Sequence, residues 1–214
     1  MAKHEQAVID AFNGYFEREA TRCGRRVRSF ALDGQDAIAG ADYILTDQSR
    51  FTLIEFKYSQ DELINEGKKP LRLQLCSALV NAPKMIALHD QCHFIAWAQR
   101  EPGQLKVRCN IYRLEVCNQH VFGRKCGLTD EMPAEKHRMF AKAFTCDFFS
   151  PVGRQCSLSL HEFECYIAWL LREGSGSQKE SFELLTDDRS SDECALVTFS
   201  SVRAAYDWMQ SQRS

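Results

Sequence analysis

The sequence predicts an α/β fold in which a mixed β-sheet is flanked by helices. Apolar side chains recur at helical spacing in residues 4–20, which predicts an amphipathic helix. Residues 51–58 are β-branched and aromatic in the way that strands prefer. Further strands and helices alternate up to residue 116, and this order suits a sheet with helices on its faces.

Three parts are expected along the chain. Residues 1–117 form the α/β core, and residues 118–173 form a helical extension that packs on it. Residues 178–214 form a small C-terminal appendage after the flexible Gly/Ser linker at 174–177. Because the appendage is too short to be stable alone, we expect it to pack on the core or on a partner.

The first helix carries a carboxylate on its apolar face. Val8, Ile9 and Phe12 follow the helical pattern, and Glu5 lies three and four residues before Val8 and Ile9. A charge on a buried face is unfavourable unless it is paired or bound to a metal. The alternative is that Glu5 sits at the helix start because negative charge suits the helix dipole there.

A hairpin is expected to follow a strand at residues 26–33. Residues 41–46 form its first strand and residues 51–58 its second, with polar turn residues between them. If Thr46 pairs with Phe51, the register of the whole antiparallel pair is fixed.

That register places Asp42 directly opposite Glu55, with Cβ atoms roughly 5 Å apart. Lys57 shares the face of Glu55, because side chains alternate along a strand. Two carboxylates at this distance repel each other, and a divalent cation such as Mg²⁺ would relieve the repulsion. The alternative is an ordinary ion pair between Glu55 and Lys57 on an exposed strand. The strand is apolar on both faces, however, which is typical of a strand covered on both sides.

Asp42, Glu55 and Lys57 resemble the PD-(D/E)xK phosphodiesterase motif of the restriction-endonuclease-like nuclease superfamily. The recognisable part covers roughly residues 5–80, and Ala41 stands where the motif has a proline that is often missing. The resemblance implies a restriction-endonuclease-like core, and Asp42, Glu55 and Lys57 as catalytic residues. It also implies that Asp42 and Glu55 hold Mg²⁺ or Mn²⁺.

Two further residues enter through the resemblance. Members of this superfamily often place an acidic residue on the first core helix, which makes Glu5 the candidate for a third metal ligand and Glu19 the second choice. Members often carry a glutamine on the helix after the motif, which makes Gln74 a candidate for active-site support. The alternative for Gln74 is a polar residue on a half-exposed helix.

Basic residues are clustered, although the net charge is −2. Binding of DNA depends on local neutralisation of phosphates, so clusters matter more than net charge. The candidate nucleic-acid-binding residues are Arg22, Arg25, Arg26, Arg28, Lys68, Lys69 and Arg72. The alternative for each cluster is a solvated loop.

The remaining elements follow from local patterns. Strands are expected at residues 85–88, 94–97 and 105–116, and a C-terminal hairpin at 182–185 and 195–199. Helices are expected at 71–81 after Pro70, at 133–144, from a capping box at Ser159 and Glu162 to Gly174, and at 202–210.

The ten cysteines are not expected to form a disulfide framework, because the chain is neither short nor evidently secreted and has no CxxC motif. Cys76, in an apolar helical stretch, is expected to be a small core residue. No apolar run approaches the ~20 residues that span a bilayer, and no signal-peptide core is present. We therefore expect a cytoplasmic protein without a membrane partner.

The favoured function is a metal-dependent nuclease that hydrolyses phosphodiester bonds in DNA. One alternative is a catalytically silent nuclease-like fold that binds nucleic acid or protein. Another is a thiol-rich metal-binding adaptor. A homodimer or a protein partner through the C-terminal region is also considered.

Overall fold

The computed structural model describes residues 2–32, 40–152, 156–175, 183–188, 191–193 and 195–212. The strands are β1 (Arg28–Ala31), β2 (Tyr43–Thr46), β3 (Arg50–Ser59), β4 (His93–Glu101), β5 (Gln104–Ile111), β6 (Met139–Phe140), β7 (Leu158–Ser159), β8 (Leu184–Asp187) and β9 (Leu196–Phe199). The α-helices are α1 (Ala2–Arg22), α3 (Pro70–Val80), α4 (Pro83–Cys92), α5 (Tyr112–Val116), α6 (Gln119–Phe122), α7 (Ala141–Phe149), α8 (Leu160–Ser175) and α9 (Val202–Ser211). Two 3-10 helices are η1 (Gln60–Lys68) and η2 (Glu135–His137).

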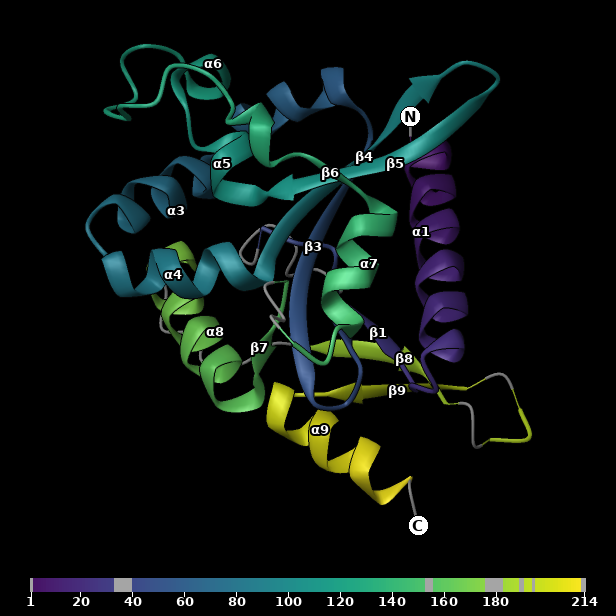
Figure 1. Ribbon diagram of the computed structural model, residues 1–214. Helices are drawn as coiled ribbons and strands as arrows, with labels where there is room; N and C mark the ends of the chain where they lie inside the picture. Colours follow the sequence, from purple (N-terminus) through teal and green to yellow (C-terminus); the bar gives the residue numbers. More distant parts are fainter. Residues whose placement is uncertain are drawn as a thin grey trace.

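The described strands form one sheet in the spatial order β6-β5-β4-β3-β2-β1-β8-β9, and β7 pairs with β3 (Figure 1). β3 and β4 run parallel, and the other described pairs are antiparallel. The protein is thus α/β with a mixed, mostly antiparallel open sheet flanked by helices. No helix in the described part of the chain has the length and apolar character needed to cross a membrane.

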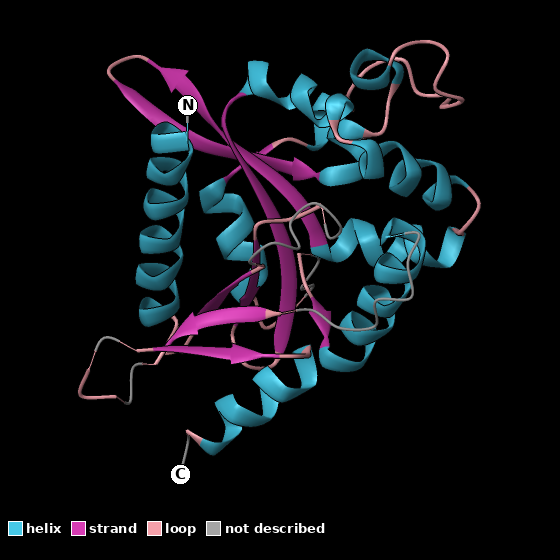
Figure 2. Ribbon diagram, turned by 180° about the vertical axis from the view of Figure 1, so that it is seen from behind, coloured by secondary structure: helices cyan, strands magenta, loops and turns pink. Residues whose placement is uncertain are grey.

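The central strand β3 meets different helices on its two faces. Phe12 of α1 contacts Phe56 of β3 with 5.3 Å between ring centroids, on the face that α7 also covers. Phe51 of β3 stacks on Phe163 of α8 at 5.4 Å on the opposite face, which α3, α4 and α9 also cover. Figures 1 and 2 show these helices on the two sides of the sheet. Burial on both sides explains the continuous apolar run of β3.

The expected hairpin register is confirmed. Thr46 pairs with Phe51, and Tyr43 pairs with Ile54. The register continues one residue further, because the backbone N–H of Asp42 donates to the carbonyl of Ile54 at 2.9 Å. Asp42 therefore faces Glu55 across the pair, on the face of β3 that also carries Phe51.

Three expected elements differ from the structure. Residues 85–88 are helical and not a strand, because Pro83 starts α4 and the helix continues to Cys92, directly before β4. Residues 105–116 are a strand only as far as Ile111, after which α5 begins. Residues 133–144 contain η2, the short strand β6 and the start of α7 instead of one helix.

The C-terminal region packs on the core, which is one of the two arrangements expected for it, the other being packing on a partner. The capping box before α8 is present, since Ser159 N–H donates to Glu162 Oε2 at 3.0 Å. β8 pairs with β1 and carries the sheet outward to β9, and α9 packs against the same apolar cluster as α8. Of the linker expected at 174–177, residues 174 and 175 belong to α8, and the remainder falls within residues 176–182, which lie outside the described residues.

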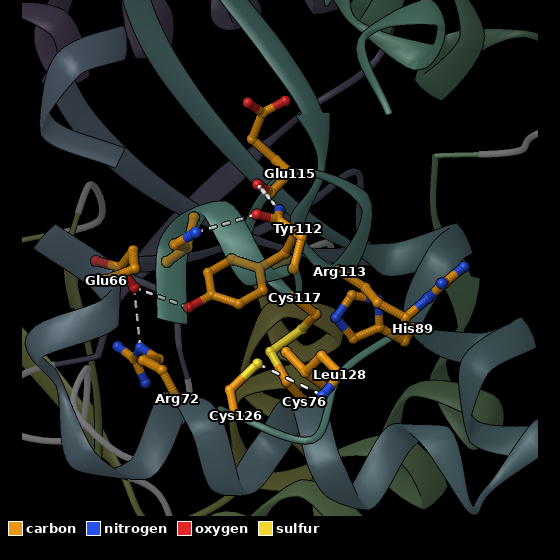
Figure 3. The surroundings of a disulfide bond; sticks show 12 residues. Glu66, Arg72, Cys76, His89, Tyr112, Arg113, Glu115, Cys117, Cys126 and Leu128 are labelled. Atoms are coloured by element: carbon orange, nitrogen blue, oxygen red, sulfur yellow. Dashed lines mark hydrogen bonds and ion pairs between the residues drawn. A yellow bond between two sulfur atoms is a disulfide. The ribbon is translucent and has the colours of Figure 1, made fainter. Parts of the chain in front are cut away.

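One disulfide corrects the expectation about the cysteines. Cys76 of α3 is bonded to Cys117, which follows α5, and is not a free core residue. The two cysteines are 41 residues apart, and only the packing of α3 beside α5 brings them together, so no local pattern reveals the pair. Figure 3 shows Cys126 beside this bond; Cys126 is free and half-buried.

Removal of this disulfide should lower stability markedly. Closing a loop of this length restricts the unfolded chain by about 4 kcal/mol in the chain-entropy model. We expect a Cys76→Ala/Cys117→Ala double variant to lose about 2–4 kcal/mol of unfolding free energy by denaturant titration. Cys23→Ala, at an exposed thiol, is the control. Equal stability of the double variant and the control would contradict a closed disulfide in the purified protein.

Candidate active site

A cluster of charged side chains lies where β3 leaves the sheet and η1 begins. Lys57 and Glu55 of β3 are buried, with 9% and 1% of their side chains exposed. Glu66 at the end of η1 is buried, and Lys69 lies at the junction of η1 and α3. Burying a charged group is costly unless the group is paired, so the contacts among these side chains decide which of them stay ionised. We call these four residues, with Glu5, Asp42 and Arg72, the charged cluster.

Asp42 is positioned by the backbone of both neighbouring strands. Its carbonyl accepts a hydrogen bond from Leu32 N–H at 2.9 Å, and its Oδ2 accepts one from Phe56 N–H at 2.6 Å. The carboxylate is therefore directed at β3, beside Glu55. The hairpin register, and not a flexible loop, sets its position.

Glu55 and Lys57 form the shortest ion pair of the cluster. Lys57 Nζ donates to Glu55 Oε1 at 2.5 Å and to the Phe56 carbonyl at 2.6 Å. Glu5 of α1 reaches the same ammonium, with 3.8 Å between Oε2 and Nζ. Thus the carboxylate on the apolar face of the first helix does meet the site that the motif predicts.

Glu66 is a fourth carboxylate that sequence reasoning missed. Its Oε2 accepts hydrogen bonds from Arg72 Nε at 3.0 Å and from Tyr112 OH at 2.8 Å (Figure 3). Its Oε1 lies 2.8 Å from Lys69 Nζ. Tyr112 comes from α5, which the sequence had assigned to a strand, so no spacing in the sequence signals this contact.

Charge balance in the cluster depends on one proton. The four carboxylates of the cluster oppose three cations, so one negative charge remains when all are ionised. Burial and the charge of Glu55 together raise the pKa of Asp42 to about 8. Burial likewise raises the pKa of Glu5, with Glu55 adding to the effect. A proton on Asp42 therefore neutralises the cluster near neutral pH.

Neighbouring groups of opposite charge keep Glu55 and Lys57 ionised. Burial opposes ionisation of Glu55, but the neighbouring Lys57 and Lys69 outweigh it, so the pKa of Glu55 is lowered. Burial also acts against the charge on Lys57, but Glu55 and Glu66 outweigh it, so the pKa of Lys57 is raised. Lys57 is an ammonium at neutral pH and is no candidate for a general base.

One oxygen of Glu55 has no hydrogen-bond partner among the described residues. Oε1 accepts from both lysines, whereas the buried Oε2 accepts from none. Buried polar atoms without a partner are rare in proteins and often mark a ligand site. Oε2 of Glu55 is thus available for a cation, and Asp42 faces Glu55 across the strand pair.

The donor set fits a hard divalent cation. Mg²⁺ binds oxygen ligands and usually takes only one or two carboxylates, with water and substrate phosphate completing its shell. Within the described ranges, no three His, Cys, Asp or Glu side chains are grouped as a complete metal centre. A site with two protein carboxylates and Glu5 as a more distant third is compatible with Mg²⁺ and unlike a structural zinc site.

Other candidate residues lie outside the cluster. The Gln74 amide is exposed and donates to the Glu173 carbonyl of α8, so it does not face the site. Glu19 pairs with Arg22 near the end of α1, at 2.6 Å. Arg22 lies about 25 Å along α1 from Glu5, at 1.5 Å rise per residue.

The arginine group near the end of α1 forms its own surface. Arg25 pairs with Asp47 at 2.7 Å, and Arg28 lies 3.5 Å from an oxygen of Asp187. Arg26 is exposed and lines a cleft beside Gln48. In the second basic group, Lys68 is exposed, whereas Lys69 and Arg72 belong to the charged cluster.

The comparisons with known proteins gave no match. No protein-family model matches the chain, and neither a curated protein nor a solved structure matches it.

Replacing Asp42 should stabilise the protein in a pH-dependent way. Because its pKa is raised on folding, its contribution to stability is full below its unfolded pKa and is lost as the pH rises towards about 8. Asp42→Asn carries no charge and keeps an oxygen for Phe56 N–H. We expect similar stability near pH 4, at the unfolded pKa, and a gain of about 2 kcal/mol or more by pH 8, measured by denaturant titration.

Asp47→Asn is the matched control for this prediction. The Asp47 carboxylate accepts hydrogen bonds from Ser49 and Arg50 N–H groups and pairs with Arg25. Its replacement should destabilise the protein near pH 8. A loss of stability in Asp42→Asn like that in Asp47→Asn would show that the Asp42 charge is compensated in the native protein.

Proposed function

We propose that the protein is a metal-dependent nuclease of the PD-(D/E)xK type that hydrolyses phosphodiester bonds in DNA. The observation that carries the proposal is that Asp42 faces buried Glu55 across the strand pair, that Glu55 Oε2 has no partner among the described residues, and that the Lys57 ammonium lies beside them. Asp42 and Glu55 would hold Mg²⁺ or Mn²⁺, with Glu5 as the third ligand. This is the residue set that the motif resemblance implies.

The order of the elements supports a restriction-endonuclease-like core. α1 is followed by the antiparallel strands β1, β2 and β3, then by helices, and then by β4, which runs parallel to β3. This general order is the one that the resemblance implies. The acidic residue on the first helix and the Glu-x-Lys on the third strand of this unit lie at one place.

Charge balance favours a phosphodiester as the substrate. With a divalent cation bound and Asp42 ionised, the three cations and four carboxylates of the cluster carry one net positive charge. One phosphodiester group carries one negative charge and would complete the balance. A neutral substrate would leave a buried positive charge uncompensated, which is costly.

Each residue then has a defined task. A bound divalent cation would supply Lewis acidity to a phosphate oxygen or to a bound water. Lys57, held charged by Glu55 and Glu66, orients the attacking water or stabilises charge on the leaving oxygen. Asp42, whose pKa is raised, would have to give up its proton to hold the cation. Glu55 is already ionised before a cation binds, because Lys57 and Lys69 lower its pKa.

DNA contacts are proposed at two separate places. Lys68 and Lys69 would contact phosphates beside the scissile bond. Arg22 lies about 25 Å along α1 from Glu5, and Arg25, Arg26 and Arg28 follow it in the chain. This group would contact phosphates several base pairs along a duplex. Arg72 is fully buried against Glu66, so it acts inside the protein and not on DNA.

Replacing Lys57 should slow cleavage strongly in protein that is still folded. Loss of one cationic group that stabilises the transition state costs about 100-fold or more in rate. We therefore expect Lys57→Met to cleave DNA at least about 100-fold more slowly with Mn²⁺. Lys84→Met, at an exposed lysine of α4, should cleave like the unmodified protein. Wild-type rates in Lys57→Met would remove Lys57 from the proposed catalytic residues.

Mg²⁺ affinity should rise with pH until about pH 8. Asp42 has a raised pKa and must lose its proton to bind a cation, so affinity should increase up to about tenfold per pH unit below that pKa. Calorimetry in buffers of different ionisation enthalpy should show about one proton released per Mg²⁺ near pH 7. Asp42→Asn should lose this pH dependence. Affinity that stays constant between about pH 6 and pH 8 would exclude Asp42 as the titrating ligand.

A further inference from the structure

Lys69 bridges the two most deeply buried carboxylates of the charged cluster. Its Nζ lies 2.8 Å from Glu55 Oε1 and 2.8 Å from Glu66 Oε1. The adjacent backbone is fixed: Lys69 N–H donates to the Glu66 carbonyl, and a Cβ on Gly67 would meet the Val121 carbonyl oxygen at 2.2 Å. The Lys69 side chain, and not its backbone, is therefore the part that can change partners.

Lys69 is the most accessible of the three cations in the cluster. Its side chain is 36% exposed, compared with 9% for Lys57 and none for Arg72. A phosphate that approaches from solvent can reach Lys69 without entering the core. Lys57 is held by Glu55 and the Phe56 carbonyl, and Arg72 is held by Glu66.

The carboxylates remain partnered if Lys69 turns away. Glu66 keeps Arg72 and Tyr112 on its Oε2, and Lys57 Nζ lies 3.6 Å from its Oε1. Glu55 keeps Lys57 but loses one of its two compensating cations. The main consequence is a stronger negative potential at Glu55, where the proposed cation binds.

We propose that Lys69 couples metal binding to phosphate binding at this site. While Lys69 contacts Glu55, it weakens the attraction of the site for a divalent cation. When a phosphate of nucleic acid binds the Lys69 ammonium, Lys69 no longer pairs with Glu55, and the cation binds more tightly. By linkage, the cation then strengthens nucleic-acid binding by the same factor. This inference rests on the proposed nuclease function.

The test uses Ca²⁺ as a cation that fits an oxygen site, with a short DNA duplex. We expect Lys69→Met to bind Ca²⁺ about tenfold more tightly than the unmodified protein in the absence of DNA. The same variant should bind the duplex more weakly. Duplex should increase Ca²⁺ affinity about tenfold in the unmodified protein and have little effect in Lys69→Met.

Two further variants separate this role from a general effect of charge or folding. Lys84→Met removes an exposed lysine of α4 outside the charged cluster, and should leave Ca²⁺ affinity unchanged. Lys69→Arg keeps the charge and should bind Ca²⁺ like the unmodified protein, even if Lys69→Met unfolds. Tighter Ca²⁺ binding by Lys69→Arg would then contradict the proposal.

The outcomes separate the coupling role of Lys69 from the proposed nuclease function. Unchanged or weaker Ca²⁺ affinity in folded Lys69→Met would overturn the coupling role of Lys69 and leave the nuclease proposal intact. Failure of the unmodified protein to bind Ca²⁺, Mg²⁺ or Mn²⁺ at millimolar concentration would overturn the proposed function itself, and the coupling with it.

Discussion

Repulsion between Asp42 and Glu55 is the constraint around which the charged cluster is arranged. The hairpin register fixes both residues, since Asp42 N–H pairs with the Ile54 carbonyl and Asp42 Oδ2 accepts from Phe56 N–H. The backbone of the central pair of strands therefore holds the two residues opposite each other. The repulsion is relieved by a proton on Asp42, and the same position suits a divalent cation.

The surrounding residues keep this pair from destabilising the sheet. Lys57 and Lys69 compensate Glu55, and Glu66 anchors Lys69 while it is itself held by Arg72 and Tyr112. The Cys76–Cys117 disulfide joins α3, which carries Arg72, to the end of α5, which carries Tyr112. The arrangement around Glu66 is therefore tied covalently as well as by hydrogen bonds.

The sequence predicted the parts of the site that depend on local pattern. The strand preference of residues 51–58 and the polar turn before them were enough to predict the register, and the register placed Asp42 opposite Glu55. Helical spacing placed Glu5 on the inner face of α1. These predictions succeeded because side-chain direction in helices and strands follows from simple periodicity.

The parts that could not be predicted depend on long-range packing. Glu66 and Tyr112 are 46 residues apart and come from a 3-10 helix and a five-residue helix, neither of which has a strong sequence pattern. Residues 85–88 are apolar enough for a strand, and only Pro83 suggests the start of α4. Cys76 and Cys117 likewise meet through tertiary structure alone.

The most direct test of the central claim is a crystal structure with Mn²⁺, measured for anomalous scattering. The account predicts one Mn²⁺ peak between Asp42 and Glu55, with a carboxylate oxygen of each at about 2.1–2.2 Å, Oε2 on the Glu55 side. It also predicts that Lys57 remains on Glu55 Oε1. Absence of a peak at saturating Mn²⁺, or a peak that Asp42 and Glu55 do not contact, would contradict the account.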